Sequence, residues 1–331
     1  MTTADVGYVA GRVTFDMLPG DVLFEIFDFY AINSESSCYP WRWHTLVHVC
    51  RRWRQVIFAS PLRFELKFVC TPRTHVRELL EFLPPSIPII IRNYFDTPPA
   101  PGSTPSIEDG SQVIAALEQR DNVCFIELED LPSSLLEKLA TTMQETYPTM
   151  KYVLLWAGDE SAPVLPKEFL GGSAPCLDRI WLRGIPFPDA PLLLSSTIDL
   201  VDLRLEKIPD SGYFSPEALI TALSTCTQLE TIVIDFIGNR HPDGPELTSQ
   251  EIASLVHIFL PALHGFAFAG HGIYFYQFLS RIQSPLFMPM LESNFDDLDK
   301  RVHYEASFTP SGREFRYGDV HLMDDPVPVE E

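Results

Sequence analysis

The chain has 331 residues, of which 45 are acidic and 24 basic, and its formal net charge is −21. With 46% apolar and 12% aromatic residues it can build a packed core, which excludes an intrinsically disordered chain. Its apolar stretches, such as residues 88–91, are far shorter than the roughly 20 residues of a membrane-spanning helix, so no such helix is expected. An acidic body repels phosphate backbones, which argues against nucleic-acid binding.

The cysteines and the N-terminal segment predict a cytoplasmic and/or nuclear protein. The 6 cysteines occur singly and without a CxxC pair, which favours reduced thiols over a disulfide scaffold or a zinc site. Residues 1–15 carry Asp5 and no apolar run, so we expect no secretory signal. We expect residues 1–14 to form a flexible N-terminus.

The excess of acidic over basic residues is confined to one part of the chain. Residues 1–100 contain 10 basic and 10 acidic side chains, whereas residues 101–331 contain 14 basic and 35 acidic ones. Such an excess is commonly a solvated surface, and a basic protein partner is the sharper interpretation. Together with a length of roughly two domains, the asymmetry predicts two parts.

Residues 15–67 are predicted to form a small helical domain. A helix that opens at Asp16 or Pro19 has one apolar face, formed by Val22, Leu23, Ile26, Phe27 and Tyr30. After a polar loop at residues 33–37, a second apolar run ends before Pro61 and comprises Leu46, Val49, Cys50, Trp53, Val56 and Ile57. The opposite face of this second helix carries Arg51, Arg52 and Arg54. A unit of this size cannot bury so much apolar surface alone, so part of it should contact a partner or the rest of the chain.

Residues 68–300 are predicted to repeat one unit of strand, turn and helix. The pattern apolar-x-x-apolar-x-apolar, typical of leucine-rich repeats, occurs with middle positions at Ile126, Val153, Ile180, Leu203, Ile232 and Phe266. Helix-start signals between them pair Ser134 with Glu137, Ser215 with Pro216, and Thr248 with Glu251. The spacings of 27, 27, 23, 29 and 34 residues favour an α/β solenoid, in a chain that is α+β overall. An ordinary doubly wound α/β domain is the alternative.

Two segments depart from this repeat. Residues 97–110 are rich in proline, serine and glycine and predict a loop within the solenoid. Residues 301–331 predict a hairpin, with a turn at residues 310–312, followed by an acidic disordered tail.

The first domain resembles an F-box. The resemblance rests on Leu18-Pro19-x-x-Val22-Leu23-x-x-Ile26-Phe27, and on the segment from Val47-x-Val49-Cys50-Arg51-Arg52-Trp53-Arg54 to Ser60-Pro61-Leu62. It covers about 50 residues, and the whole arrangement is similar to fungal F-box proteins with degenerate leucine-rich repeats. Segment 31–45 is longer than the compact turn of that family.

This resemblance implies that the chain is the substrate-recognition subunit of a cullin-RING (SCF-type) ubiquitin ligase. The F-box would bind a Skp-type adaptor, and through it a cullin scaffold, while the repeat domain would bind a protein substrate. The residues expected to offer an apolar surface to the adaptor are Leu18, Pro19, Val22, Ile26, Val49, Cys50 and Trp53. Leu23, Phe27 and Ile57 are instead expected in the core of the F-box.

No catalytic or cofactor-binding set is found in the sequence. Neither a G-x-S-x-G elbow nor a glycine-rich phosphate loop is present, and we expect no cofactor, no metal site and no enzymatic activity. His264 and His271 are interpreted as ordinary residues at strand ends. A repeat scaffold or interaction protein outside any ligase is one alternative function, and a small α/β hydrolase is another.

Substrate recognition is predicted on the open face of the repeat sheet. Side chains that alternate with the buried positions should line it, namely Phe125, Glu127, Glu129, Tyr152, Leu154, Trp156, Arg179, Trp181, Arg183, Asp202, Arg204, Glu206, Thr231, Val233 and Asp235. The residues expected to bind substrate are Trp156, Arg179, Trp181, Arg183, Arg204 and Glu206, because Trp and Arg are enriched in binding hot spots. The alternative is that loops or the next segment cover Trp156 and Trp181.

Overall fold

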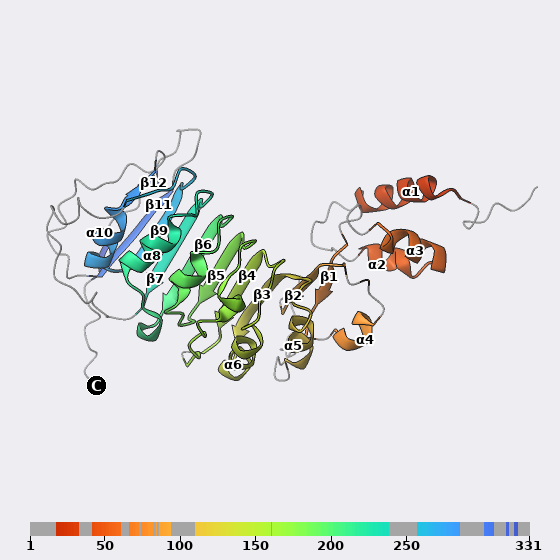
Figure 1. Ribbon diagram of the computed structural model, residues 1–331, viewed down its shortest axis with the longest axis horizontal. Coiled ribbons are helices and arrows are strands. Elements are labelled where there is room, and N and C mark those ends of the chain that lie inside the picture. Colours follow the sequence, from red (N-terminus) through yellow and green to blue (C-terminus); the bar gives the residue numbers. More distant parts are fainter. Residues whose placement is uncertain are drawn as a thin grey trace, which may run out of the picture. The chain divides into compact units, whose positions relative to one another are not determined.

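The computed structural model is a mixed α/β structure with one large, mostly parallel sheet (Figure 1). It describes residues 18–32, 42–60, 66–72, 74–81, 84, 86–93, 110–159, 161–237, 257–284, 301–307, 316–317 and 321–323. The chain divides into two compact units, residues 1–69 with 84–88 (unit 1) and residues 70–83 with 89–331 (unit 2). Strand β1 (Phe68–Cys70) lies where the chain leaves the first stretch of unit 1.

Unit 1 is helical and has its own small core. Its helices are α1 (Gly20–Ile32), α2 (Arg42–Val47) and α3 (Arg51–Phe58). Leu23, Phe27 and Ile57 are each 0% exposed, which confirms the predicted core positions. The Phe27 ring meets the edge of Trp53, with centroids 4.8 Å apart and an interplanar angle of 71°.

The second apolar run of unit 1 is two helices, not the single helix that its spacing predicts. A turn at residues 48–49 separates α2 from α3, and Cys50 then has the extended backbone of a helix N-cap (φ −158°, ψ 168°). Its Sγ accepts a hydrogen bond from the Trp53 backbone N–H at 3.4 Å. Helical periodicity runs through this turn, so spacing alone does not reveal the break.

The large sheet of unit 2 is built in the order of the sequence. Its parallel strands are β2 (Ile89–Arg92), β3 (Val123–Leu131), β4 (Tyr152–Ala157), β5 (Arg179–Arg183), β6 (Asp202–Ile208), β7 (Thr231–Phe236) and β9 (Gly265–His271). Each strand pairs with the next one in this series. A doubly wound sheet reverses its strand order at a switch point, and these seven strands contain no such reversal.

The middle apolar position of every predicted repeat falls on one row of the sheet. Pairing joins Ile126 to Val153, and it continues through the following strands to Ile180, Leu203, Ile232 and Phe266. All six side chains are at most 2% exposed. The row forms because neighbouring parallel strands pair with these positions in register, on the face that is buried.

Helices lie along the face of the sheet that carries this buried row (Figure 1). They are α4 (Val76–Leu80), α5 (Ser111–Leu117), α6 (Ser133–Thr142), α7 (Ala190–Leu194), α8 (Pro216–Leu223) and α10 (Gly272–Leu279), with 3₁₀ turns at Phe169–Gly172 and Asp210–Gly212. The expected cap of α8 is confirmed, since Ser215 Oγ accepts from the Ala218 backbone N–H at 3.2 Å and proline follows.

The capping box predicted at Ser134 and Glu137 is wrong. Helix α6 begins one residue earlier, at Ser133, and its N-cap residue Pro132 has no side chain that can accept a hydrogen bond. The acceptor comes from the end of the next strand, because Asp159 Oδ2 takes the Ser133 backbone N–H at 3.0 Å. Thr248 and Glu251, the third predicted start, lie outside the described residues.

The C-terminal segment, for which a hairpin was predicted, adds strands to the large sheet. Strand β11 (Arg301–Ser307) pairs antiparallel with β9, and β12 (Arg316–Tyr317) and β13 (His321–Met323) both pair antiparallel with β11. Pairing with β11 removes the open edge that β9 would otherwise present. A separate two-stranded parallel sheet is formed by β8 (Ile258–Phe259) and β10 (Ile282–Gln283). The predicted turn at residues 310–312, the tail beyond 323, the loop 97–109 and residues 1–14 lie outside the described residues.

Candidate functional site

Unit 1 presents apolar side chains on the side of α1 that faces away from its core. Val22 is 38% exposed and Ile26 is half-buried, while Leu23 and Phe27 on the other side are fully buried. At the start of the helix Pro19 is exposed and Leu18 is half-buried. These four predicted contact residues therefore lie at or near the surface.

One residue extends this surface beyond the predicted set. Phe29 is 73% exposed, an unusual exposure for a phenylalanine, and it follows Val22 and Ile26 at the i, i+4, i+7 spacing of one helix face. That spacing was visible in the sequence. The F-box-like motif ends at Phe27 and does not include Phe29.

The remaining predicted contact residues differ in placement. Val49 is 57% exposed in the turn before α3, and Cys50 is half-buried as the N-cap of that helix. Trp53 is only 7% exposed and packs on Phe27, so its indole belongs to the interior of unit 1. We define the α1 surface as Leu18, Pro19, Val22, Ile26 and Phe29, with Val49 in the neighbouring turn.

Two arginines of the second F-box-like segment connect the helices of unit 1. The Arg52 guanidinium donates to the Leu18 carbonyl oxygen, and Arg54 Nε donates to the Val47 carbonyl oxygen at 3.0 Å. Arg52 thus binds the chain just before α1, and Arg54 caps the C-terminal end of α2. The sequence identified these side chains only as a polar face.

The open face of the unit 2 sheet carries two pairs of aromatic rings on β3, β4 and β5. Phe125 and Tyr152 stack with centroids 4.2 Å apart and planes 14° from parallel. Trp156 and Trp181 meet edge to face, 5.2 Å apart at 69°. Leu154 lies between Tyr152 and Trp156 on β4, pairs in register with Trp181, and is 2% exposed, so this predicted lining residue is covered.

Three arginines lie over these rings. Arg92 is 4.7 Å from the Phe125 centroid, Arg183 is 5.1 Å from that of Trp156, and Arg204 is 4.9 Å from that of Trp181. A guanidinium over an aromatic face is attracted by the ring quadrupole and is held in a defined orientation. We call this set the aromatic–arginine ladder, formed by Arg92, Phe125, Tyr152, Trp156, Trp181, Arg183 and Arg204.

Each ladder arginine also has a carboxylate beside it. Arg92 Nε is 2.8 Å from Glu127 Oε2, Arg204 Nε is 3.0 Å from Asp202 Oδ1, and Arg183 Nη1 is 4.0 Å from Glu206 Oε2. The three arginine side chains are 34–36% exposed, so the ladder reaches solvent. Glu206, a predicted binding residue, therefore lies beside Arg183 within the same arrangement.

The predicted alternative, that Trp156 and Trp181 are covered, holds in part. Both rings are half-buried. Both indole Nε1 atoms are hidden from solvent and have no hydrogen-bond partner among the described residues. The ring contacts found for them in the described part of the chain come from side chains of the sheet itself. Both indoles still contribute surface beside Arg183 and Arg204.

Two strands of the open face contain a bulge at the same level. Pairing shifts by one residue between Leu128 and Leu131 in β3, and again between Leu205 and Ile208 in β6. The extra residues, Asp130 and Lys207, both have φ of 51°, a left-handed backbone that is uncommon outside glycine. Both bulges have a trace in the apolar pattern, because the spacing between buried apolar residues widens from two to three at Leu128–Leu131 and at Leu205–Ile208.

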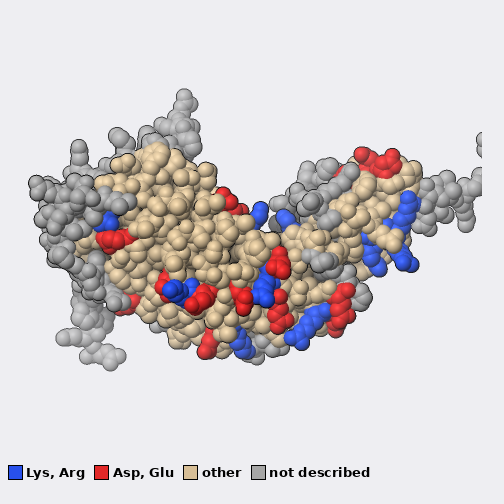
Figure 2. All heavy atoms as spheres, viewed as in Figure 1, with Lys and Arg blue, Asp and Glu red and all other residues tan. Residues whose placement is uncertain are grey.

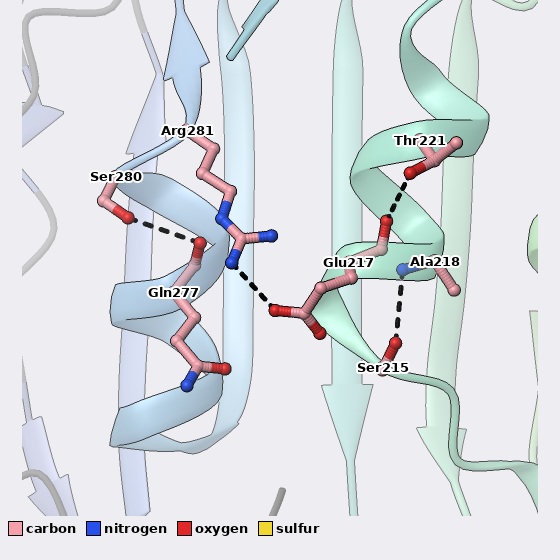
Figure 3. Close-up of polar contacts among 7 residues, drawn as sticks. All are labelled: Ser215, Glu217, Ala218, Thr221, Gln277, Ser280 and Arg281. Carbon is pink, nitrogen blue, oxygen red and sulfur yellow. Dashed lines mark hydrogen bonds and ion pairs between the residues drawn. The ribbon is translucent and has the colours of Figure 1, made fainter. Parts of the chain in front are cut away.

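A buried arginine lies on the helical side of unit 2. Arg281, at the end of α10, is 3% exposed, and its Nη2 donates to Glu217 Oε1 of α8 at 2.8 Å (Figure 3). Figure 3 shows the guanidinium of Arg281, which follows α10, pointing toward the carboxylate of Glu217 on α8. On the face of unit 2 that carries these helices, basic and acidic side chains are intermingled (Figure 2).

The described residues hold no arrangement with obvious catalytic chemistry. No group of three or more His, Cys, Asp or Glu side chains among them could hold a metal ion. Burial raises the pKa of the Cys70 thiol to about 12 and also raises that of Cys226, which makes both poor nucleophiles. The polar cluster of Ser133, Asp159 and Ser161 contains no histidine and serves to cap α6.

The comparisons with known proteins leave the chain without an assigned family. No model of a known protein family matches it, and no curated protein is found as a relative. Within the described ranges, no helix combines the length and apolar character that crossing a membrane requires. A function must therefore be argued from the two surfaces and the sequence.

Proposed function

We propose that this chain is the substrate-recognition subunit of a cullin-RING (SCF-type) ubiquitin ligase and has no catalytic activity of its own. In this proposal unit 1 is an F-box that binds a Skp-type adaptor, which connects it to a cullin scaffold. Unit 2 is a leucine-rich-repeat-like solenoid that binds a protein substrate. The complex acts in the cytoplasm, the nucleus or both.

The α1 surface is the single observation that carries the adaptor half of the proposal. A helix of a small domain with its own core leaves Val22 and Phe29 exposed on one face, beside the half-buried Ile26. Apolar side chains at this spacing are the usual anchors of helix-mediated binding. The same segment carries the F-box-like sequence, which supplies the class of partner.

The order of the strands in the large sheet supports the proposal that unit 2 is a leucine-rich-repeat-like solenoid. Parallel strands that follow one another without reversal, with one apolar row through all of them, are what stacked repeats produce. The antiparallel β11 at the end is compatible with a terminal element that differs from the repeats it covers.

The aromatic–arginine ladder supports substrate binding on the open face. Its guanidinium groups are held over rings and beside carboxylates, so little side-chain entropy remains to be lost when a partner binds. Trp and Arg are also the residue types that dominate binding hot spots. The excess of acidic residues after residue 100 favours a substrate with basic patches.

Co-expression with a Skp-type adaptor tests the proposal. We expect the full chain to co-purify with the adaptor, and a Val22→Glu variant to lose it while circular dichroism remains unchanged. A known F-box protein serves as the positive control. If the control is retained and this chain is not, the ligase function is wrong and a repeat scaffold outside any ligase becomes the better proposal.

A further inference from the structure

Most charges within the aromatic–arginine ladder are already neutralised by the sheet. Arg92 lies beside Glu127, Arg204 beside Asp202 and, less closely, Arg183 beside Glu206. The faces of three rings are occupied by these arginines. The middle of the open face therefore presents a rigid surface with balanced charge.

Charges without a counter-ion lie at the two opposite ends of this surface. Arg179, the first residue of β5, is exposed, and its side chain forms no ion pair or hydrogen bond with the described residues. Asp202, its partner in register on β6, is paired with Arg204 instead. Glu129 and Asp130, near the C-terminal end of β3, likewise have no basic partner in the described part of the chain. The positive end and the negative end are thus separated by the rings.

The negative end is crowded with like charges. Burial raises the pKa of the Glu129 carboxyl, and the neighbouring Glu127 and Asp130 carboxylates raise it further. The Arg92 guanidinium lies beside Glu127 and does not relieve this crowding at Glu129. A cation from outside the chain would relieve it.

The distance between the two ends suits a short extended segment. Arg179 pairs in register with Tyr152, and Tyr152 with Phe125, from which Glu129 lies further along the same strand. Two strand spacings of about 4.8 Å and four residues at about 3.3 Å each separate Arg179 from Glu129, which gives a distance of roughly 16 Å along the sheet. About five residues of extended polypeptide span this length.

We propose that the open face binds an extended polypeptide segment with opposite charges at its two ends. A basic residue of the segment lies at Glu129 and Asp130, apolar residues lie on Trp156 and Trp181, and an acidic residue lies at Arg179. The inference rests on the proposed substrate-binding role of this face and defines the chemistry of what it binds. The proposed substrate preference was for basic patches, and this inference adds that the bound segment also carries an acidic residue at its other end.

Fluorescence anisotropy with the full chain and labelled peptides tests this proposal. The probe has two lysines and two glutamates at opposite ends of a leucine–serine spacer of about four residues. The comparison peptides carry lysines at both ends or glutamates at both ends. We expect the probe to bind more tightly than either comparison peptide, and neutralisation of one end of the site to weaken its binding about two- to fivefold.

The variants remove charge while keeping shape. Glu129→Gln with Asp130→Asn neutralises the negative end and relieves repulsion, so folding is not at risk, and Arg179→Gln neutralises the positive end. Glu137→Gln with Lys138→Gln, both exposed on α6, is the control on the helical side. Equal binding of all three peptides, no binding of the probe, or insensitivity to the site variants would overturn the inference. Adaptor co-purification from the same preparations tests the ligase function separately.

Discussion

At the scale of single residues, Tyr147, between α6 and β4, is hydrogen-bonded to the end of α5. Its side chain is 2% exposed, and its hydroxyl donates to the Leu117 carbonyl oxygen at 3.1 Å. Burial is the main reason that the pKa of this phenol rises to about 12. This buried hydroxyl should stabilise the fold at neutral pH through its hydrogen bond, and its raised pKa should lower stability at alkaline pH.

Tyr147→Phe should lower the free energy of unfolding by roughly 0.5–1.5 kcal/mol at neutral pH, because the Leu117 carbonyl loses its donor. Between pH 9 and pH 11 the wild-type chain should lose about 1 kcal/mol more stability than the variant does, since the unfolded Tyr147 phenol ionises near pH 10 while the folded one keeps its proton. Chemical denaturation of both proteins at the two pH values measures this. The Cys70 thiol titrates in the same direction in both and cancels in the difference.

At the scale of elements, the apolar pattern predicts the strands that share it better than it predicts short strands without it or the ends of helices. The row from Ile126 to Phe266 was readable because each parallel strand repeats the same three apolar positions. Strand β2 was missed, since Ile89–Arg92 is a short continuous apolar run without that pattern. The capping residue of α6 differs from the predicted one because its acceptor, Asp159, comes from the segment after β4.

The candidate surfaces show the same limit. Alternation along a strand placed Trp156 and Trp181 on the open face, as the structure has them. It could not show that Arg183 and Arg204 lie over the two indoles or that Leu154 is covered, because these contacts depend on the register between strands. In unit 1, the turn before Cys50 sets the orientation of α3 and turns Trp53 inward.

Asp159 should protect the first turn of α6 against hydrogen exchange. It accepts from the Ser133 backbone N–H, and Ser133 also holds the pKa of its carboxyl below the ordinary value. We expect Asp159→Ala to speed exchange at the start of α6, and Asp159→Asn, which can still accept, to do so less. Because the pKa is lowered, the protection should persist above the ordinary aspartate pKa and fade as pH falls through the lowered one. Unchanged exchange in the alanine variant would show that another group caps the helix.

Glu217 should matter because of the buried cation that it neutralises. Removing it by Glu217→Ala leaves Arg281, 3% exposed, without its carboxylate partner, and should cost about 1–3 kcal/mol after allowance for the half-exposed glutamate. The double variant Glu217→Ala with Arg281→Met should recover part of this loss, since no buried charge then lacks a partner. Thermal unfolding of the single and double variants measures how much stability is lost and how much is recovered. A double variant less stable than the single one would mean that Arg281 stabilises mainly through packing.

At the scale of the whole molecule, the two surfaces belong to different units. The α1 surface is built on the core around Phe27, and the aromatic–arginine ladder on the buried row of the large sheet. Neither surface shares a residue with the other. Substitutions on them should therefore act independently, because each surface rests on its own core and the two share no residue.

Adaptor binding and substrate capture should fail separately. Replacing Leu18 and Pro19 by alanine, or Phe29 by alanine, should weaken adaptor binding by about 2 kcal/mol or more if they are interface anchors, and leave peptide binding unchanged. Trp156→Ala with Trp181→Ala should remove peptide binding and leave adaptor affinity unchanged. Both affinities are measured on each variant and on the combined one, whose losses should equal those of the parents to within about 0.5 kcal/mol. A combined variant that departs further from additivity would show that the two surfaces are coupled, and a ladder variant that loses the adaptor would contradict the division of roles.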